Sequence, residues 1–370
     1  MILGVIIGEF APGVREKLDT AKFDSVSLPI AIGLIVMMWP VLTKVQYETL
    51  PGVFRTARLW KHLFISVILN WIVGPSLMLG LAWATLPDLP GYRTGVIMVG
   101  VARCIAMVVI WNDLARGDAE YCAILVVVNA VLQIALFSPF SVLFINIISG
   151  ANTGGERVNY GDVAISVLIY LGIPLAAGIV TRYGVIALTS KHFFQKKFLP
   201  VFSPLSLLGL LYTIIVLFAY QGHRILHNIG PVFRVFVPQI LYFIIMWTGT
   251  FFLIHWFSTV ENRRLHDPSK KVFGYDTAVV QAFTAASNNF ELAIAVCIAV
   301  YGVNSEQALA ATIGPLTEVP VLLALTWVAL YLKHKLVWES PSIKGRTDVE
   351  RTSAPSEEKG HSFRVMDLDF

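Results

Sequence analysis

The sequence predicts an all-α polytopic membrane protein, a ten-helix transporter made of two inverted five-helix repeats. Composition is the first reason, because 56% of the 370 residues are apolar, only 14% are charged and the mean hydropathy is +0.70; soluble domains are far more polar. The second reason is that apolar segments long enough to cross a hydrocarbon core, roughly 20 residues as a helix, recur along the chain. The third is that two of these segments carry polar residues at the same depth, which indicates a pair of interrupted helices.

Nine complete spans follow from apolar length. Residues 1–10 are apolar but too short to span, and they lack the basic start and cleavage site of a signal peptide. We interpret them as the second half of a first helix that is cut short in this chain, with an interfacial segment as the alternative. The nine spans are Ser27–Val45, His62–Leu86, Thr94–Trp111, Tyr121–Ile148, Asp162–Thr181, Val201–Tyr220, Ile229–Phe257, Thr277–Tyr301 and Gln307–Leu332.

Basic residues predict the orientation. When the loops are assigned alternately to two sides, one side with the tail holds 20 of the 28 Lys and Arg, the other holds seven, and the remaining one is Arg103 inside a span. The excess of positive charge predicts a cytoplasmic location for the richer side and the tail, and it gives no indication of nucleic-acid binding. We expect the plasma membrane, with the vacuolar membrane as the alternative. Residues 337–370 are polar and predict a disordered cytoplasmic tail.

The two halves of the chain have a similar pattern. Cys104 lies 14 residues before the polar turn at Asp118, and Glu291 lies 14 residues before the turn at Ser305. Five spans per half is an odd number, so the halves insert with opposite orientations, as in many secondary transporters. We therefore expect a first repeat over residues 1–148 and a second, inverted repeat over residues 149–336.

Several classes of chemistry lack a motif. Cys104, Cys122 and Cys297 show no CxxC or Cys/His spacing, so neither a disulfide framework nor a zinc site is predicted. The absence of GxxxxGK[ST] argues against an ATP-driven pump. No nucleophile and base set indicates an enzyme, and no cofactor is expected.

Three segments strongly resemble the arsenical-resistance-3 arsenite exporters. VARCIAMV at residues 101–108, continuing to Tyr121, resembles their fourth helix; ASNNFELA at 286–293 resembles the ninth, and IGPLTEVPV at 313–321 the tenth. The resemblance extends to about Trp338, and the loop over residues 261–276 and the tail are more similar to fungal than to bacterial members. It implies the fold of the bile-acid, arsenite and riboflavin transporter superfamily, in which a panel and a core subdomain are joined and discontinuous helices 4 and 9 cross.

The resemblance also implies a substrate, a coupling ion and a ligand. The expected activity is export of arsenite, with antimonite as a second candidate, in exchange for protons by alternating access. Cys104 offers a soft sulfur to the thiophilic metalloid. Arg103 beside it favours the thiolate, whereas apolar burial disfavours it. The alternative for Cys104 is a small packing residue, which is the role expected for Cys122 and Cys297.

Glu291 and Glu318 are the acidic candidates. A carboxyl group in a low-dielectric crossing can hold a proton near neutral pH, which an antiporter requires. We expect Glu291 to alternate between protonated and substrate-accepting states, Glu318 to act as a relay or second acceptor, and Arg103 to couple the metalloid to the proton. The alternative is a permanent ion pair between Arg103 and one of these acids, because a buried guanidinium needs partners.

Further polar residues are candidates for substrate contact. Short polar side chains can satisfy the backbone of an unwound crossing, or can bind the hydroxyls of arsenite, and both roles stay open. Trp111 also fits an aromatic anchor near a span end, while Asn129 and Gln133 share a helix face. The candidates are Ser287, Asn288, Asn289, Asn129, Asn70 and Trp111.

Other functions remain as rivals. A sodium-coupled organic-anion symporter would share the fold, since carboxylate and amide oxygens can also bind sodium. A non-transporting receptor would not need two matched polar breaks, and a membrane enzyme lacks a motif. The oligomeric state is not indicated by the sequence.

Overall fold

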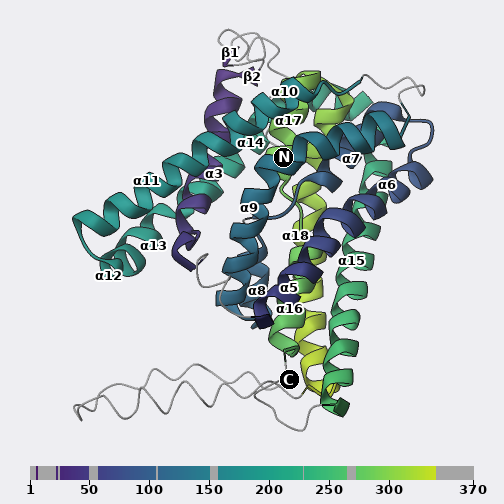
Figure 1. Ribbon diagram of the computed structural model, residues 1–370. Helices are drawn as coiled ribbons and strands as arrows, with labels where there is room; N and C mark the ends of the chain where they lie inside the picture. Colours follow the sequence, from purple (N-terminus) through teal and green to yellow (C-terminus); the bar gives the residue numbers. More distant parts are fainter. Residues whose placement is uncertain are drawn as a thin grey trace.

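The structure is a computed structural model that describes residues 6, 22–23, 26–49, 57–105, 107–150, 157–227, 229–264 and 272–338. The prediction of a shortened first helix over residues 1–10 lies outside these residues, apart from Ile6. The prediction of a disordered tail likewise falls on residues beyond 338 almost entirely. Within the described residues the chain is almost wholly helical (Figure 1).

In the described part of the first half, two short antiparallel strands of two residues each, β1 (Lys22–Phe23) and β2 (Val26–Ser27), precede the helices. Asp118 caps α9 by accepting a hydrogen bond from Tyr121 N at 2.9 Å, as short polar residues at helix starts commonly do. The elements are α3 (Leu28–Lys44), η1 (Tyr47–Thr49), α5 (Ala57–Ile68), η2 (Leu69–Val73), α6 (Gly74–Thr85), α7 (Pro90–Val101), α8 (Met107–Leu114), α9 (Ala119–Ser141) and η3 (Val142–Ile148).

The second half is also helical, and like the first it contains a broken helix that is followed by a long one. Ser305 caps its last helix by accepting from Ala308 N at 3.1 Å. The elements are α10 (Tyr160–Val167), η4 (Leu168–Gly172), α11 (Ile173–Leu188), α12 (Lys191–Phe193), η5 (Phe194–Phe198), α13 (Leu199–Phe202), α14 (Pro204–His227), α15 (Ile229–Arg264), α16 (Tyr275–Ala286), α17 (Phe290–Tyr301) and α18 (Glu306–Lys335).

All nine predicted spans correspond to helical segments. Six continuous helical stretches in the described residues are long and apolar enough to cross a membrane, and α3 and α17 are shorter apolar helices. The two spans predicted to be interrupted are the ones that break, into α7 and α8 and into α16 and α17. The division into repeats at residues 148 and 149 stays a prediction.

Prolines explain three wide turns within the spans. Pro75, Pro174 and Pro200 each lie two residues after a π-helical stretch, η2, η4 and η5 respectively. Proline lacks an N–H and clashes with the carbonyl four residues earlier. A π-turn widens the helix and is a common way to accommodate such a break.

The helices form two bodies. In the first, α3 packs between α11 and α14, and glycines bring the backbones together, as small residues do in membrane helices. A Cβ on Gly178 of α11 would lie 2.9 Å from Leu42 C, and one on Gly209 of α14 would lie 2.8 Å from Met37 N. The second body comprises α5 to α9 and α15 to α18, held by contacts of α15 with α16 and α18 and of α7 with α18 and α6.

The two bodies meet mainly at one end of the molecule. The opposite end is called the basic end below, because Lys44, Arg116, Lys196, Lys197 and Arg264 lie there. Away from it, α10 packs on α9 and α17, β2 packs on α17, and Gln221 of α14 donates to Val303 O at 2.7 Å. Toward the basic end, α11, α12 and α13 make no extensive contact with the described part of the second body, and Figure 1 shows them diverging from α5, α8 and α16.

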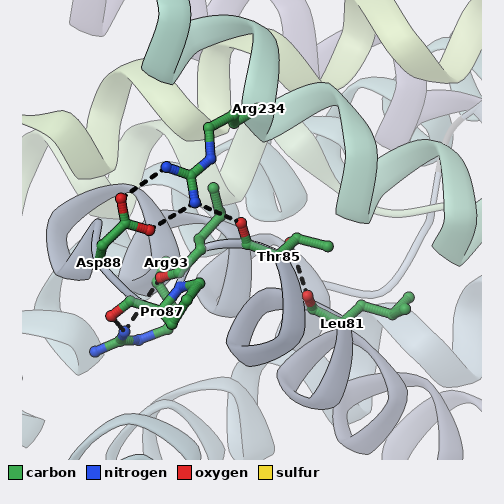
Figure 2. A network of polar contacts seen from close by, with 7 residues as sticks. Leu81, Thr85, Pro87, Asp88, Arg93 and Arg234 are labelled. Atoms are coloured by element: carbon green, nitrogen blue, oxygen red, sulfur yellow. Dashed lines mark hydrogen bonds and ion pairs between the residues drawn. The ribbon is translucent and has the colours of Figure 1, made fainter.

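Figure 2 shows how the second body is fastened at the end opposite the basic end. Arg234 of α15 donates to both carboxylate oxygens of Asp88 at 2.7 and 2.6 Å, and to Thr85 O at 2.9 Å. These hydrogen bonds lower the pKa of the Asp88 carboxyl to about 2. Arg93 donates to Pro87 O at 2.8 Å in the same α6–α7 turn. The start of α15 is thereby joined to the turn before α7.

Candidate transport site

The two interrupted helices cross through backbone contacts. The chain leaves α7 at Val101 and is non-helical through residues 102–105, and it leaves α16 at Ala286 and re-enters a helix at Phe290. Arg103 and Asn288 form an isolated antiparallel bridge. Next to the bridge, Asn289 N donates to Ala102 O at 3.2 Å. The matched depth predicted from the sequence is therefore a direct pairing of the two breaks.

Asparagines satisfy the freed backbone groups at this crossing. The Asn288 amide donates to Val99 O at 2.9 Å and to Ala102 O at 3.1 Å, so it binds carbonyls that have lost helical partners at the end of α7. Asn289 Oδ1 accepts from Leu292 N at 3.1 Å and caps α17. Asn288 Oδ1 and Asn289 Nδ2 are buried and have no hydrogen-bond partner among the described residues, so each amide keeps one atom for another ligand.

Helix α9 supports the first break from behind. The side-chain oxygen of Gln133 accepts from Arg103 N, and Asn129 Nδ2 donates to Cys104 O at 3.4 Å. These two residues are four apart and face the crossing together, as their spacing predicts. Both are buried. Their role in the structure is to hold the backbone of residues 103 and 104.

Cys104 lies at the amino-terminal end of α8. Its sulfur accepts a hydrogen bond from Val108 N at 3.4 Å, and the side chain is buried. Glu291 occupies the first turn of α17, close to the other break. Helix amino termini favour negative charge through unpaired N–H groups and the helix dipole. The two candidate substrate and proton ligands thus lie at the positive ends of two half-helices.

Glu318 of α18 reaches the same crossing. Ser287 Oγ donates to Glu318 Oε1, and the carboxyl is close enough to Glu291 and to the Trp111 indole to interact with them electrostatically. The Trp111 N–H acts on the Glu318 carboxyl, although it does not reach full hydrogen-bond geometry toward any described residue. The Glu291 carboxyl interacts with its own backbone N–H, and it makes no ion pair within the part of the chain that the structure describes. The two acids therefore form a pair of neighbouring buried carboxyls.

Arg103 faces the other way. Its guanidinium is fully buried and donates to Gly100 O and, at 2.9 Å, to the hydroxyl of Tyr242 on α15. Among the described residues it makes no ion pair with Glu291 or Glu318. The alternative of a permanent ion pair between the halves therefore has no counterpart in this structure.

Other candidates lie at varying distance from the crossing. Asn70 is buried in η2, where its amide donates to Ser66 O at 2.8 Å, and Gly74 one turn later lies beside the Arg103 guanidinium. Cys122 and Cys297 are free and buried, in α9 and α17. No described group of three or more His, Cys, Asp or Glu could hold a metal ion.

Sequence reasoning missed Tyr242 and Gln239. They lie three residues apart on α15, both buried, and Gln239 Oε1 accepts from Thr317 Oγ1 at 2.8 Å, one residue before Glu318. The available signal was two polar side chains on one face of a long apolar helix. Their spacing alone does not say that this face meets the crossing.

Fold and site together define a polytopic helical membrane transporter. The sequence pattern described as the Sodium Bile acid symporter family matches residues 31–228, and the chain belongs to this family. It is 41% identical over 347 residues to the arsenical-resistance protein Acr3 of Corynebacterium glutamicum, across 93% of this chain and 89% of the relative. The Acr3 protein of Alkaliphilus metalliredigens is 29% identical across 90% of each chain. An uncharacterized transporter of Synechocystis sp. is 31% identical across 88% of this chain and 84% of its own length.

These relatives confirm the resemblance found in the sequence. Two of the three carry a name that refers to arsenical resistance, and they align with nearly the whole chain rather than with one segment. The protein is therefore a multi-pass membrane transporter of the arsenical-resistance type.

Proposed function

We propose that the protein exports arsenite from the cytoplasm in exchange for protons, by alternating access at the crossing of the two broken helices. The observation that carries the proposal is the grouping of a thiol and two neighbouring carboxyls at one crossing. Cys104 supplies a soft ligand to the metalloid, and a proton that binds at Glu291 or Glu318 neutralises a charge that the buried site otherwise has to hold. Antimonite, a chemically similar trihydroxide, is a second candidate substrate.

The arrangement of the two bodies supports the cycle. They are packed together away from the basic end and diverge toward it. If the basic end faces the cytoplasm, as the charge bias predicts, the two bodies lie apart on the side from which substrate is loaded, while the side chains of the crossing itself are buried. Rocking of one body against the other would then expose the crossing to the opposite side.

Unpartnered polar atoms around the crossing suit a small hydroxylated substrate. Gln133 Nε2 and Asn289 Nδ2 are donors and Asn288 Oδ1 is an acceptor, and all three are buried without a hydrogen-bond partner among the described residues. Arsenite as a trihydroxide both donates and accepts hydrogen bonds. These atoms can bind the hydroxyls of the substrate while Cys104 contacts the arsenic atom transiently.

The runner-up is a sodium-coupled organic-anion symporter. The family description, which names sodium and bile acid, favours it, and carboxylate and amide oxygens can bind sodium. Everted vesicles that carry the protein separate the two functions. Arsenite uptake into them should follow an imposed proton gradient and be indifferent to a sodium gradient of the same size; the reverse dependence would overturn the proton-coupled proposal.

Two variants test the residue roles. Cys104→Ala should abolish arsenite transport, whereas Cys297→Ala, at an equally buried cysteine on α17, should transport at close to the wild-type rate. Glu291→Gln should remove coupling to the proton gradient. Wild-type exchange by Glu291→Gln, or equal losses in the two cysteine variants at matched expression, would contradict the assignment.

A further inference from the structure

Arg103 lies where the carboxyl-terminal ends of two half-helices meet. Its guanidinium donates directly to Gly100 O in the last turn of α7. It also donates to the Tyr242 hydroxyl at 2.9 Å, and that hydroxyl donates to Ala285 O in the last turn of α16 at 3.0 Å. One guanidinium is thus linked to a carbonyl at the end of each half-helix, directly in one case and through Tyr242 in the other.

The charges of this arrangement balance. The carboxyl-terminal end of a helix carries about −0.5 elementary charge, so two such ends amount to about one negative charge. Arg103 supplies one fixed positive charge in a space where its side chain is fully buried. Cys104 and Glu291 lie instead at the amino-terminal ends of α8 and α17, so the crossing has a negative pole filled by Arg103 and a positive pole that faces the candidate ligands.

We propose that the Arg103 guanidinium is a resident cation of the crossing, bound to the ends of α7 and α16, and that Tyr242 is the positioning residue that links it to α16. Gly74 is part of the same arrangement, because a larger residue would not fit beside the guanidinium. A Cβ at that position would lie 2.5 Å from Arg103 Nη1 and 3.0 Å from Tyr242 OH. The guanidinium is therefore enclosed by α6, α7 and α15, and Tyr242 connects it to the end of α16.

A consequence for coupling rests on the proposed transport function. Unwound carbonyls and carboxyl-terminal half-helix ends are where transporters of this architecture commonly hold sodium. With a guanidinium bound there, the described crossing needs no inorganic cation to neutralise these two ends. The transport cycle should then be independent of sodium, and removal of Arg103 should make it dependent on an added cation.

Thermal stability tests the resident cation without reference to transport. Purified Arg103→Ala in detergent should gain several degrees of apparent melting temperature from millimolar guanidinium, because the ion can refill the space, while tetramethylammonium at equal concentration should have no effect. Wild type should respond to neither. An equal response of wild type and Arg103→Ala to guanidinium, or no response of a folded Arg103→Ala, would overturn the proposal.

Two further variants keep the test decisive if Arg103→Ala does not fold. Tyr242→Phe removes only the bridging hydroxyl, and Gly74→Ala crowds the guanidinium; both should lower the melting temperature. Their controls are Tyr331→Phe, at an exposed tyrosine on α18, and Gly80→Ala, where a Cβ would meet nothing within 4 Å. Losses no larger than in these controls would overturn the positioning role.

Transport then separates this proposal from the proposed function. Tyr242→Phe should lower the initial rate of arsenite efflux roughly tenfold, the ratio expected when one hydrogen bond to a charged group is lost. Guanidinium should restore efflux by Arg103→Ala several-fold and leave Tyr242→Phe unchanged, which a merely structural defect would not reproduce. If wild type moves no arsenite while the stability results hold, the proposed function fails and the resident cation stands.

Discussion

Position 314 requires glycine because of a neighbouring side chain and not because of the local backbone conformation. A Cβ on Gly314 of α18 would run into the ring of Phe290, the first residue of α17. This close approach brings Glu318, one turn further along α18, to Ser287 and the crossing. We predict that Gly314→Ala destabilises the protein by about 1–3 kcal/mol, the usual cost of overpacking a tight core, and that it lowers the rate of arsenite efflux.

The control for this change is Gly184→Ala on α11. A Cβ there would meet nothing within 4 Å, and alanine is a better helix former than glycine by up to about 1 kcal/mol. Its melting temperature in detergent should therefore equal or exceed that of wild type, while that of Gly314→Ala falls by several degrees. Similar melting curves for the two variants would show that Phe290 does not restrict position 314.

The cost of polarity in lipid explains which residues of the site could be predicted from the sequence. Arg103, Cys104 and residues 287–291 stood out because polar groups inside apolar spans need a reason, and the structure does bring the two breaks into contact. The pairing of Arg103 with Tyr242 could not be predicted. It depends on a contact between helices 139 residues apart in sequence, and tyrosine is too common in membrane spans to signal such a partner.

At the scale of elements, an arginine holds the end of one helix to another. Arg182 of α11 donates to both carboxylate oxygens of Glu48 in η1, at 3.1 and 2.7 Å, and to Thr43 O at 3.3 Å in the last turn of α3. Partial burial acts to raise the pKa of the Glu48 carboxyl, but the hydrogen bonds and charge of Arg182 outweigh it and hold this pKa below its ordinary value of 4.5. The pair fastens α11 to the chain that leaves α3.

This pair should make stability depend on acid pH. Because the folded-state pKa of Glu48 lies below the unfolded one, the pair stabilises the fold above pH 4.5, and its contribution declines as the pH falls below that value. We predict that Glu48→Gln lowers stability at pH 7 by about 1.5–3 kcal/mol, as expected when a hydrogen bond to a charged group is lost. Melting curves from pH 7 to pH 3 should show the gap between variant and wild type closing with acidity; a constant gap would contradict the prediction.

The limits of the helices show the same division between what the sequence predicts and what it does not. Apolar length predicts each span to within a few residues at most ends, since a span must cross a fixed hydrocarbon thickness. The π-turns η2, η4 and η5 could be anticipated only as kinks at Pro75, Pro174 and Pro200. Whether a proline bends a helix or widens a turn depends on the helices packed around it.

At the scale of the whole molecule, the order of the spans suggests two related halves, but the two bodies do not coincide with them. Helix α3 from the first half packs with α11 and α14 from the second. Inverted insertion of the two halves, which stays a prediction, would bring elements from both halves together in this way. The helices of a body approach closely at small residues, such as Gly178 and Gly209. A single sequence does not show which helix each of these glycines will contact.

Alternating access predicts that the contact between the bodies opposite the basic end must break in each cycle. Gln221 of the first body donates to Val303 O of the second at 2.7 Å. Cysteines at these two positions, in a Cys122→Ala and Cys297→Ala background, should be joined by a short bifunctional thiol reagent, and the joined protein should lose arsenite transport because the bodies can no longer separate there. When the link consists of disulfide bonds, its reduction should restore the rate.

The control is a pair of cysteines at positions 88 and 234. Asp88 and Arg234 lie at the same end but within one body (Figure 2), so cysteines there should be joined without loss of transport, since that body moves as a unit. Transport that persists in protein joined at 221 and 303 would exclude rocking of the two bodies as the mechanism.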